Sequence, residues 1–237
     1  MDSRISTIIE QPPAFLSAVL MVTDDERRLQ RGLIQAERKS PPRYTAARDH
    51  LLRVLQGQIS FTFALSQARK IAKVVDRRCA VDVMEALEPY LNKQGVVRIE
   101  RLAAAPVEVL EGLSIDVGPI WVAHSPDAAR LFVCHLWESP LSDWQLGVAG
   151  RLIKAFLRDH YVRYAGLEID FICASLSDLS RRRGLRVYGW ERLDLLVNDQ
   201  DEERFWKRFK KGWIAYKSAP PRIYRVRQGG LFNRGGD

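Results

Sequence analysis

Apolar residues recur at helical spacing through most of the first third of the chain. The pattern predicts one helix over Asp24–Ala36 and a helix-rich region from Thr45 to about Asn92, with a brief strand at Ile59–Phe63. Between the two helical regions, residues 38–44 are polar and contain two prolines, which end a helix. This break predicts a short linker.

The pattern changes after Gly95, where β-branched residues replace the helical spacing as far as Ala123. Pro106, Gly112 and the pair Gly118-Pro119 divide this stretch, so we expect two or three strands there.

Helices and strands are both predicted in the second half. Ser125-Pro126-Asp127 has the residue types of a helix start and predicts a helix to about Trp137. A second helix is expected from Asp143, with Ser142 as its N-cap. Further along the chain we expect short strands at Tyr161–Tyr164 and Ile169–Ala174, a longer strand at Leu185–Val197, a helix from Asp199, and a last strand at Arg222–Arg227.

These elements predict an α/β (α+β) protein in two parts. Residues 1–94 would form a helical N-terminal region, and residues 95–237 would form a mixed sheet flanked by helices.

Composition narrows the class of protein. The chain has 237 residues, of which 46% are hydrophobic and 28% charged. This composition excludes a collagen-like, disordered or disulfide-scaffold protein. No apolar run approaches the roughly 20 residues that span a bilayer. The three cysteines are an odd number at wide spacings, which is typical of a reducing compartment and predicts a cytoplasmic protein.

The net charge of +8 is concentrated near the C-terminus, because the segment Arg204–Arg234 contains ten Lys or Arg residues and no Asp or Glu. Such a surface suits an acidic protein partner, or nucleic acid, because aromatic residues alternate with the cations. A third interpretation is a solvated helix face with the aromatics packed on the core. The predicted partner-binding residues are Lys207, Arg208, Lys210, Lys211, Arg222, Arg225 and Arg227.

One segment resembles a known family. The run Leu136-Trp-Glu-Ser-Pro-Leu-Ser-Asp-Trp144 is similar to the signature Trp-Leu-Trp-x-Ser-Pro-Leu-His-x-x-Trp of the toxin-activating lysine acyltransferases of Gram-negative bacteria. Two positions differ: His135 stands at the first Trp of the signature, and Ser142 stands at its catalytic His.

Looser similarities follow in the order of that family and extend the resemblance to residues 125–230. Trp190-Glu-Arg-Leu-Asp-Leu-Leu196 matches the strand with the family's catalytic Asp, here Asp194, although Val197–Gln200 replaces the family's Ala-Pro-Phe-Gly. Gly147–Ile153 and Arg181–Tyr188 resemble the helix and turn of the large N-acetyltransferase superfamily. Close helix packing is the alternative explanation for Gly147 and Gly150.

The resemblance implies transfer of a fatty acyl group from acyl carrier protein to a lysine of a partner protein, with no other cofactor. Attack by a lysine needs a base that takes its proton near neutral pH, and a histidine held by a carboxylate supplies one. A Ser142 hydroxyl is not such a base. His135 or His160 could replace it, Asp194 could act alone, or the site could be inactive.

Each of these residues also has an ordinary structural explanation. Ser142 suits a helix N-cap, His135 a half-buried helix position, and Asp194 the exposed face of a strand. No pair of Cys or His has metal-ligand spacing. The sequence therefore predicts a protein-lysine acyltransferase-like protein, active or degenerate, or alternatively a non-catalytic protein that binds nucleic acid or a partner through its basic C-terminal surface.

Overall fold

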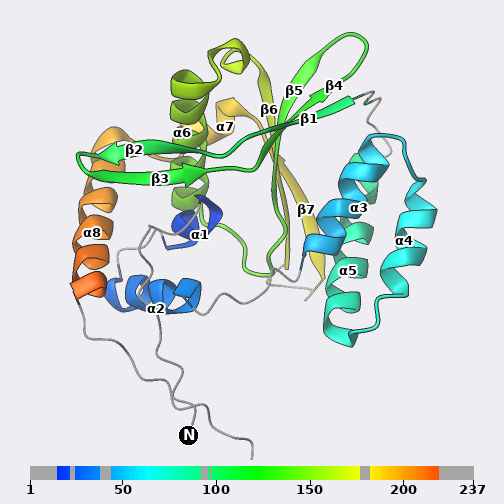
Figure 1. Cartoon of the computed structure of the whole chain (residues 1–237), viewed down its shortest axis with the longest axis horizontal. Coiled ribbons are helices and arrows are strands. Elements are labelled where there is room, and N and C mark those ends of the chain that lie inside the picture. The colour runs from blue at the N-terminus through cyan, green and yellow to red at the C-terminus, as the bar shows by residue number, and fades with distance from the viewer. Residues whose placement is uncertain are drawn as a thin grey trace, which may run out of the picture.

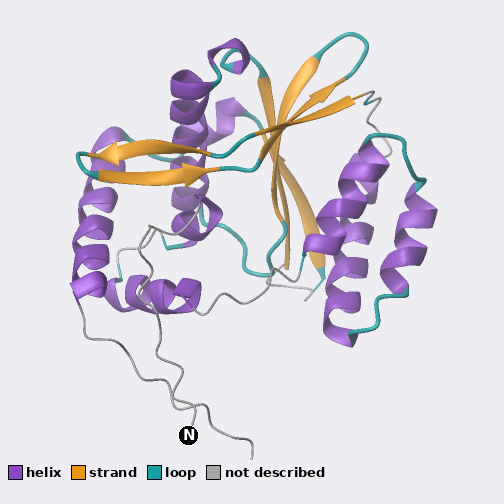
Figure 2. Cartoon of the chain, in the orientation of Figure 1, coloured by secondary structure: helices purple, strands orange, loops and turns teal. Residues whose placement is uncertain are grey.

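The chain is an α+β protein in which a mixed sheet is covered by helices (Figures 1 and 2). The computed structural model describes residues 15–21, 25–37, 44–91, 96, 98–176 and 182–218. The helices are α1 (Phe15–Leu20), α2 (Glu26–Glu37), α3 (Thr45–Leu55), α4 (Phe61–Arg69), α5 (Val74–Leu91), α6 (Asp143–His160), η1 (Val162–Tyr164, a 3-10 turn), α7 (Trp190–Asp194) and α8 (Asp199–Ser218). The predicted fold class, with its helical N-terminal region, is confirmed.

The main sheet has the order β1-β4-β5-β6-β7. Its strands are β1 (Arg98–Leu102), β4 (Ile120–His124), β5 (Ala129–His135), β6 (Glu168–Leu176) and β7 (Arg183–Tyr188). Only β5 and β6 run parallel among these neighbours, and α6 connects them, because a parallel pair needs a crossover connection. The chain just after β5 stays joined to the last residue of β6, since Leu176 N donates to Glu138 O at 2.9 Å.

A separate two-stranded sheet is formed by β2 (Ala105–Leu110) and β3 (Leu113–Val117), which we call the hairpin arm. The arm continues β1 and β4, but the ribbon bends where Ala104 meets Gly118. A Cβ at Gly118 would lie 2.9 Å from that of Ala104, and the φ of +148° at this position favours glycine. The bend takes the arm away from the sheet and over α6 to α8 (Figure 1).

The two faces of the sheet are covered by different helices. Side chains alternate along each strand, so Leu131 and Val133 pack in one core with α6 and α8, whereas Phe132 and Cys134 pack in another with α3 and α5. The N-terminal region contributes to both cores, because α1 and α2 lie on the α6 side and α3–α5 on the opposite side (Figure 1).

Several predicted elements are confirmed. The helices from Asp143 and Asp199 are α6 and α8, and the predicted strand at Ile169–Ala174 lies within β6. The Gly95–Ala123 stretch forms strands, as predicted, but contains four rather than two or three.

The helix predicted from Ser125 is wrong. Ser125 N donates to Ala128 O at 2.8 Å in a tight turn, and the following residues form β5. The run Leu131–Leu136 is buried at every position. Such a continuous apolar run is typical of a strand covered on both faces, whereas an amphipathic helix would expose some positions.

Three shorter predictions are also wrong. The strand at Ile59–Phe63 is the start of α4, because Ser60 Oγ accepts from Phe63 N at 3.1 Å as an N-cap. Tyr161–Tyr164 forms η1 rather than a strand. The predicted strand Leu185–Val197 ends at Tyr188, where Gly189 begins α7. The strand predicted at Arg222–Arg227 lies outside the described residues.

In the part of the chain that the structure describes, no helix is long and apolar enough to cross a membrane. Cys79, Cys134 and Cys173 are buried thiols.

Candidate functional site

The four predicted catalytic residues lie at the ends of different elements. Ser142 precedes α6 and His160 ends it, and α6 has 18 residues. A helix of that size is about 27 Å long. His135 is the last residue of β5, not a helix residue. Asp194 ends the short helix α7 and is not on a strand.

Ser142 is the N-cap of α6, as one of its two interpretations predicted. Its Oγ accepts from Gln145 N at 3.3 Å, and its own N–H donates to Gln145 Oε1 at 2.9 Å. These two bonds form a capping box. The hydroxyl therefore stabilises a helix start.

Asp194 is paired with a lysine rather than an imidazole. Lys154 Nζ donates to Asp194 Oδ2 at 2.6 Å, and both side chains are nearly half exposed. Lys154 is three turns along α6 from Ser142, a separation of about 18 Å. The carboxylate does not orient a group at position 142.

Both candidate histidines form hydrogen bonds to backbone carbonyl oxygens. His135 is fully buried, with Nε2 2.9 Å from Ser139 O. Because that oxygen only accepts, Nε2 carries the hydrogen, and Nδ1 is a buried atom with no partner among the described residues. His160 Nε2 lies 2.8 Å from Pro106 O and ties the arm to the end of α6. These contacts explain both residues structurally.

We expect the stability of the protein to fall as the pH drops below about 6.5. Burial lowers the pKa of His135 below its usual 6.5, and burial also lowers the pKa of the half-buried His50. Each unfolded imidazole then binds a proton that the folded one does not, so the free energy of unfolding decreases with falling pH. For the buried His135 the slope is up to about 1.4 kcal/mol per pH unit, and solvent screening makes the contribution of His50 smaller.

Denaturant titrations between pH 7.5 and 5.5 measure this dependence. H135Q should have a shallower slope than the wild type, because its side chain does not titrate. An equal slope would contradict the assignment to His135.

The structure does bring together three of the predicted partner-binding residues. Lys207, Lys210 and Lys211 lie along one side of α8, beside the tip of the hairpin arm. They border a hollow of about 590 Å³, which we call the basic groove. The groove is lined by Leu110, Glu111, Lys207, Lys210, Lys211, Ile214 and Ala215. Arg222, Arg225 and Arg227 lie outside the described residues.

The aromatic residues of α8 face away from this groove into the core. Phe205, Trp206, Phe209 and Trp213 are each 5% exposed or less. They recur at helical spacing on one side of α8, which leaves the lysines on the other. The interpretation in which the aromatics pack on the core is therefore correct.

Polar contacts fix the two sides of the groove. Lys210 Nζ donates to Glu111 O at the arm tip, and Lys207 Nζ lies 2.7 Å from Glu203 Oε1 on α8. Ile214 remains 53% exposed, although it is a large apolar residue. The groove thus combines cations with an uncovered apolar floor.

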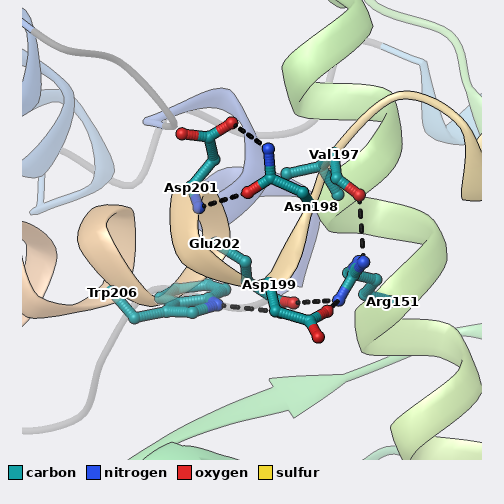
Figure 3. A network of polar contacts seen from close by, with 7 residues as sticks. All are labelled: Arg151, Val197, Asn198, Asp199, Asp201, Glu202 and Trp206. Atoms are coloured by element: carbon teal, nitrogen blue, oxygen red, sulfur yellow. Dashed lines mark hydrogen bonds and ion pairs between the residues drawn. The ribbon is translucent and has the colours of Figure 1, made fainter.

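The start of α8 is held against α6 by one arginine (Figure 3). Arg151 donates to Val197 O at 2.9 Å and to Glu202 Oε2 at 3.2 Å, and it also pairs with Asp199. Trp206 Nε1 donates to the other oxygen of Glu202 at 3.2 Å. This network sets the position of α8 and thereby of the groove.

A second hollow, of about 240 Å³, lies beside the Arg151 network and is bordered by carboxylates. Each of the following has a partner: Glu203 pairs with Lys207, Glu108 accepts from Gly112 N, and Asp199 and Glu202 pair with Arg151. Asp199 and Glu202 therefore connect α8 to α6, whereas the bonds of Glu203 and Glu108 stay within α8 and within the arm.

Comparison of the chain with protein families, curated proteins and solved structures finds no match. The resemblance to the lysine acyltransferases remains a prediction. The candidate site therefore rests on the geometry of the groove.

Sequence reasoning found the cations of the groove but missed its floor. Leu110 belongs to β2, which is far from α8 in the sequence, and no local pattern connects the two. Ile214 did carry a signal, because it follows Lys210 and Lys211 by four and three residues and so falls on the polar side of α8. A single exposed apolar residue is ordinary, and Ile214 matters here because it lines the same hollow as Leu110 and the lysines.

Proposed function

We propose that the protein binds an acidic protein partner through the basic groove. The observation that carries this proposal is the gathering of Lys207, Lys210 and Lys211 around an uncovered apolar floor. Complementary charge steers such a partner to the surface, and burial of the floor holds it there.

The same geometry favours a protein over nucleic acid. Sequence-independent binding of single strands depends on exposed aromatic rings on which bases stack. The rings of α8 are buried, so they are not available for stacking. Leu110 and Ile214 offer apolar contacts instead, which suit the apolar side chains of a protein surface.

Acyl carrier protein is the first partner to test, because the resemblance implies it and because it is strongly acidic. Acyl transfer to a lysine is the second candidate function. Its support is the place of the matching segment Leu136–Trp144, which follows the carboxyl end of β5 and leads into α6. Within it, Glu138 O accepts from Leu176 N at the carboxyl end of the parallel strand β6, and sites in α/β sheets are usually found at such ends. The buried thiols are consistent with the predicted cytoplasmic location.

We expect acyl carrier protein to bind the full chain, and K207E/K211E to weaken that binding at least about tenfold, because it places like charges opposite the partner's carboxylates. The measurement is isothermal titration calorimetry at 50 and 200 mM NaCl, with weaker binding expected at the higher salt. The acyl carrier protein carries a radiolabelled fatty acid, so that transfer is monitored in the same samples.

The matched control is K70E/K73E, which makes the same change of charge at exposed positions near the start of α5, away from the groove. It should bind like the wild type. Label that moves to a lysine would favour the acyltransferase function over binding alone. Tighter binding of a duplex or single-stranded DNA that depends on the same two lysines would replace the proposal with the nucleic-acid alternative. If neither acyl carrier protein nor DNA binds the chain, the proposed function is overturned.

A further inference from the structure

The floor of the basic groove is apolar, and charge alone does not explain it. Leu110 is partly buried at the end of β2, Ile214 is 53% exposed on α8, and both line the same hollow with Ala215. Water contact with such residues is unfavourable, and an apolar hollow bordered by polar residues marks a surface that a partner covers.

We infer that the partner inserts an amphipathic helix into the basic groove, with an aliphatic side chain between Leu110 and Ile214 and carboxylates on Lys207 and Lys211. This inference rests on the proposed function and names the form of the acidic partner. It excludes an acidic chain that lacks an apolar face.

The spacing of the lysines specifies a helix. Lys207 and Lys211 are four residues apart on α8. Their side chains therefore project from the same face about 6 Å apart. Carboxylates at positions i and i+4 of a partner helix have the same separation. A helix that packs along α8 therefore presents two acids to the two lysines without a change of register.

Ile214 continues the same row by three residues beyond Lys211. An apolar residue one turn further along the partner helix meets it, which gives the anchor pattern of a helix in a groove. The groove has a volume of about 590 Å³. Ligand pockets measure roughly 300–1,000 Å³, so the groove has room for an apolar side chain besides the acids.

The arm tip sets the other limit of the groove. Lys210 Nζ donates to Glu111 O, so this lysine holds the arm against α8 instead of facing the partner. A Cβ on Gly112 would lie 3.8 Å from the same Nζ. Lys207 is also paired, but with the exposed Glu203 one turn away on α8, so a partner carboxylate would have to share or replace that ion pair. Lys207 and Lys211 are thus the two lysines to vary in a binding test, and Lys210 is the one to leave intact.

Two labelled synthetic peptides of identical composition test the inference. The first has glutamates at positions i and i+4 and leucines at positions i+3 and i+7. All four side chains then lie on one face of a helix, which is both acidic and apolar. In the second, the same residues are scrambled so that no face forms, and polyglutamate of equal charge is a third probe. Binding to the full chain is measured by fluorescence anisotropy.

We expect the first peptide to bind at least tenfold more tightly than the other two probes. I214A should remove most of this advantage, I214L should retain it, and K207E/K211E should weaken all three probes. V162A removes the same kind of exposed apolar surface on η1, where Val162 is 75% exposed, and should change nothing. Near-UV circular dichroism of each variant checks that the fold is unchanged.

The outcomes separate the inference from the proposed function. Equal binding of the three probes, lost in K207E/K211E, would overturn the helix and leave the acidic partner in place. Failure of every probe and of acyl carrier protein would overturn both. A dimer in sedimentation analysis that is lost in I214A would also overturn the inference, because a second copy of the chain would then cover the groove.

Discussion

Trp206→Ala is expected to lower the free energy of unfolding by about 3–5 kcal/mol, the usual cost of removing a buried tryptophan. Trp206 is 1% exposed and contacts the rings of Phe205 and Phe209 at centroid distances of 4.7 and 5.7 Å. The change also removes the indole N–H that donates to Glu202 in the Arg151 network. Urea denaturation monitored by far-UV circular dichroism measures the effect.

The control for this variant is I214A on the same helix. Ile214 is 53% exposed. Substitutions of exposed residues usually change stability by less than about 0.5 kcal/mol. A loss below about 1 kcal/mol in Trp206→Ala would show that α8 is not packed on the core as described.

Gly147→Leu is expected to destabilise the fold by about 2–3 kcal/mol through overpacking. A Cβ at Gly147 would lie 2.9 Å from Val197 Cβ and 3.1 Å from the Leu196 carbonyl carbon, so a side chain would push the α7–α8 connection away from α6. Glycine is otherwise unfavourable inside a helix by about 1 kcal/mol relative to alanine. If Gly147 were not in close contact with Val197, replacing it would therefore stabilise α6. The sign of the change in the free energy of unfolding thus shows whether the contact exists.

Gly184→Ala provides the comparison, because nothing lies within 4 Å of a Cβ at Gly184 in β7. It should be neutral or slightly stabilising in the same urea titrations. An increase in stability for Gly147→Leu would contradict the contact between α6 and Val197.

The helices that bury one face were predictable from the sequence, because their apolar spacing is local information. In α6, the capping serine and the periodic apolar residues indicated both the start and the buried face. The same holds for α8, where acids at the start and lysines later complement the helix dipole.

Features that depend on tertiary packing were not predictable in the same way. Ser125-Pro126-Asp127 starts a turn as readily as a helix, and burial on both faces of the sheet decided for β5. Asp194 was placed on a strand because apolar residues surround it. In the fold, Leu193 packs over Gly150, Leu195 is 80% exposed, and a short helix satisfies both.

Of the basic groove, the sequence could predict the lysines but not the apolar floor, because only the lysines lie close together in the sequence. The lysines are adjacent in the sequence and were recognised as a surface, whereas the floor needs the hairpin arm. The catalytic role of the predicted set stays a prediction. Sequence similarity could not show that Ser142 caps α6 while Asp194, on α7, pairs with Lys154 further along that helix.

The bend at Gly118 gives the groove a high contact order. Glu111 and Lys210 are 99 residues apart in sequence, and they meet only because the bend directs the arm over α6. Closing a chain segment of that length costs conformational entropy, which the contacts around the groove have to offset. A partner that binds here recognises the finished native state and, by mass action, shifts the folding equilibrium toward it.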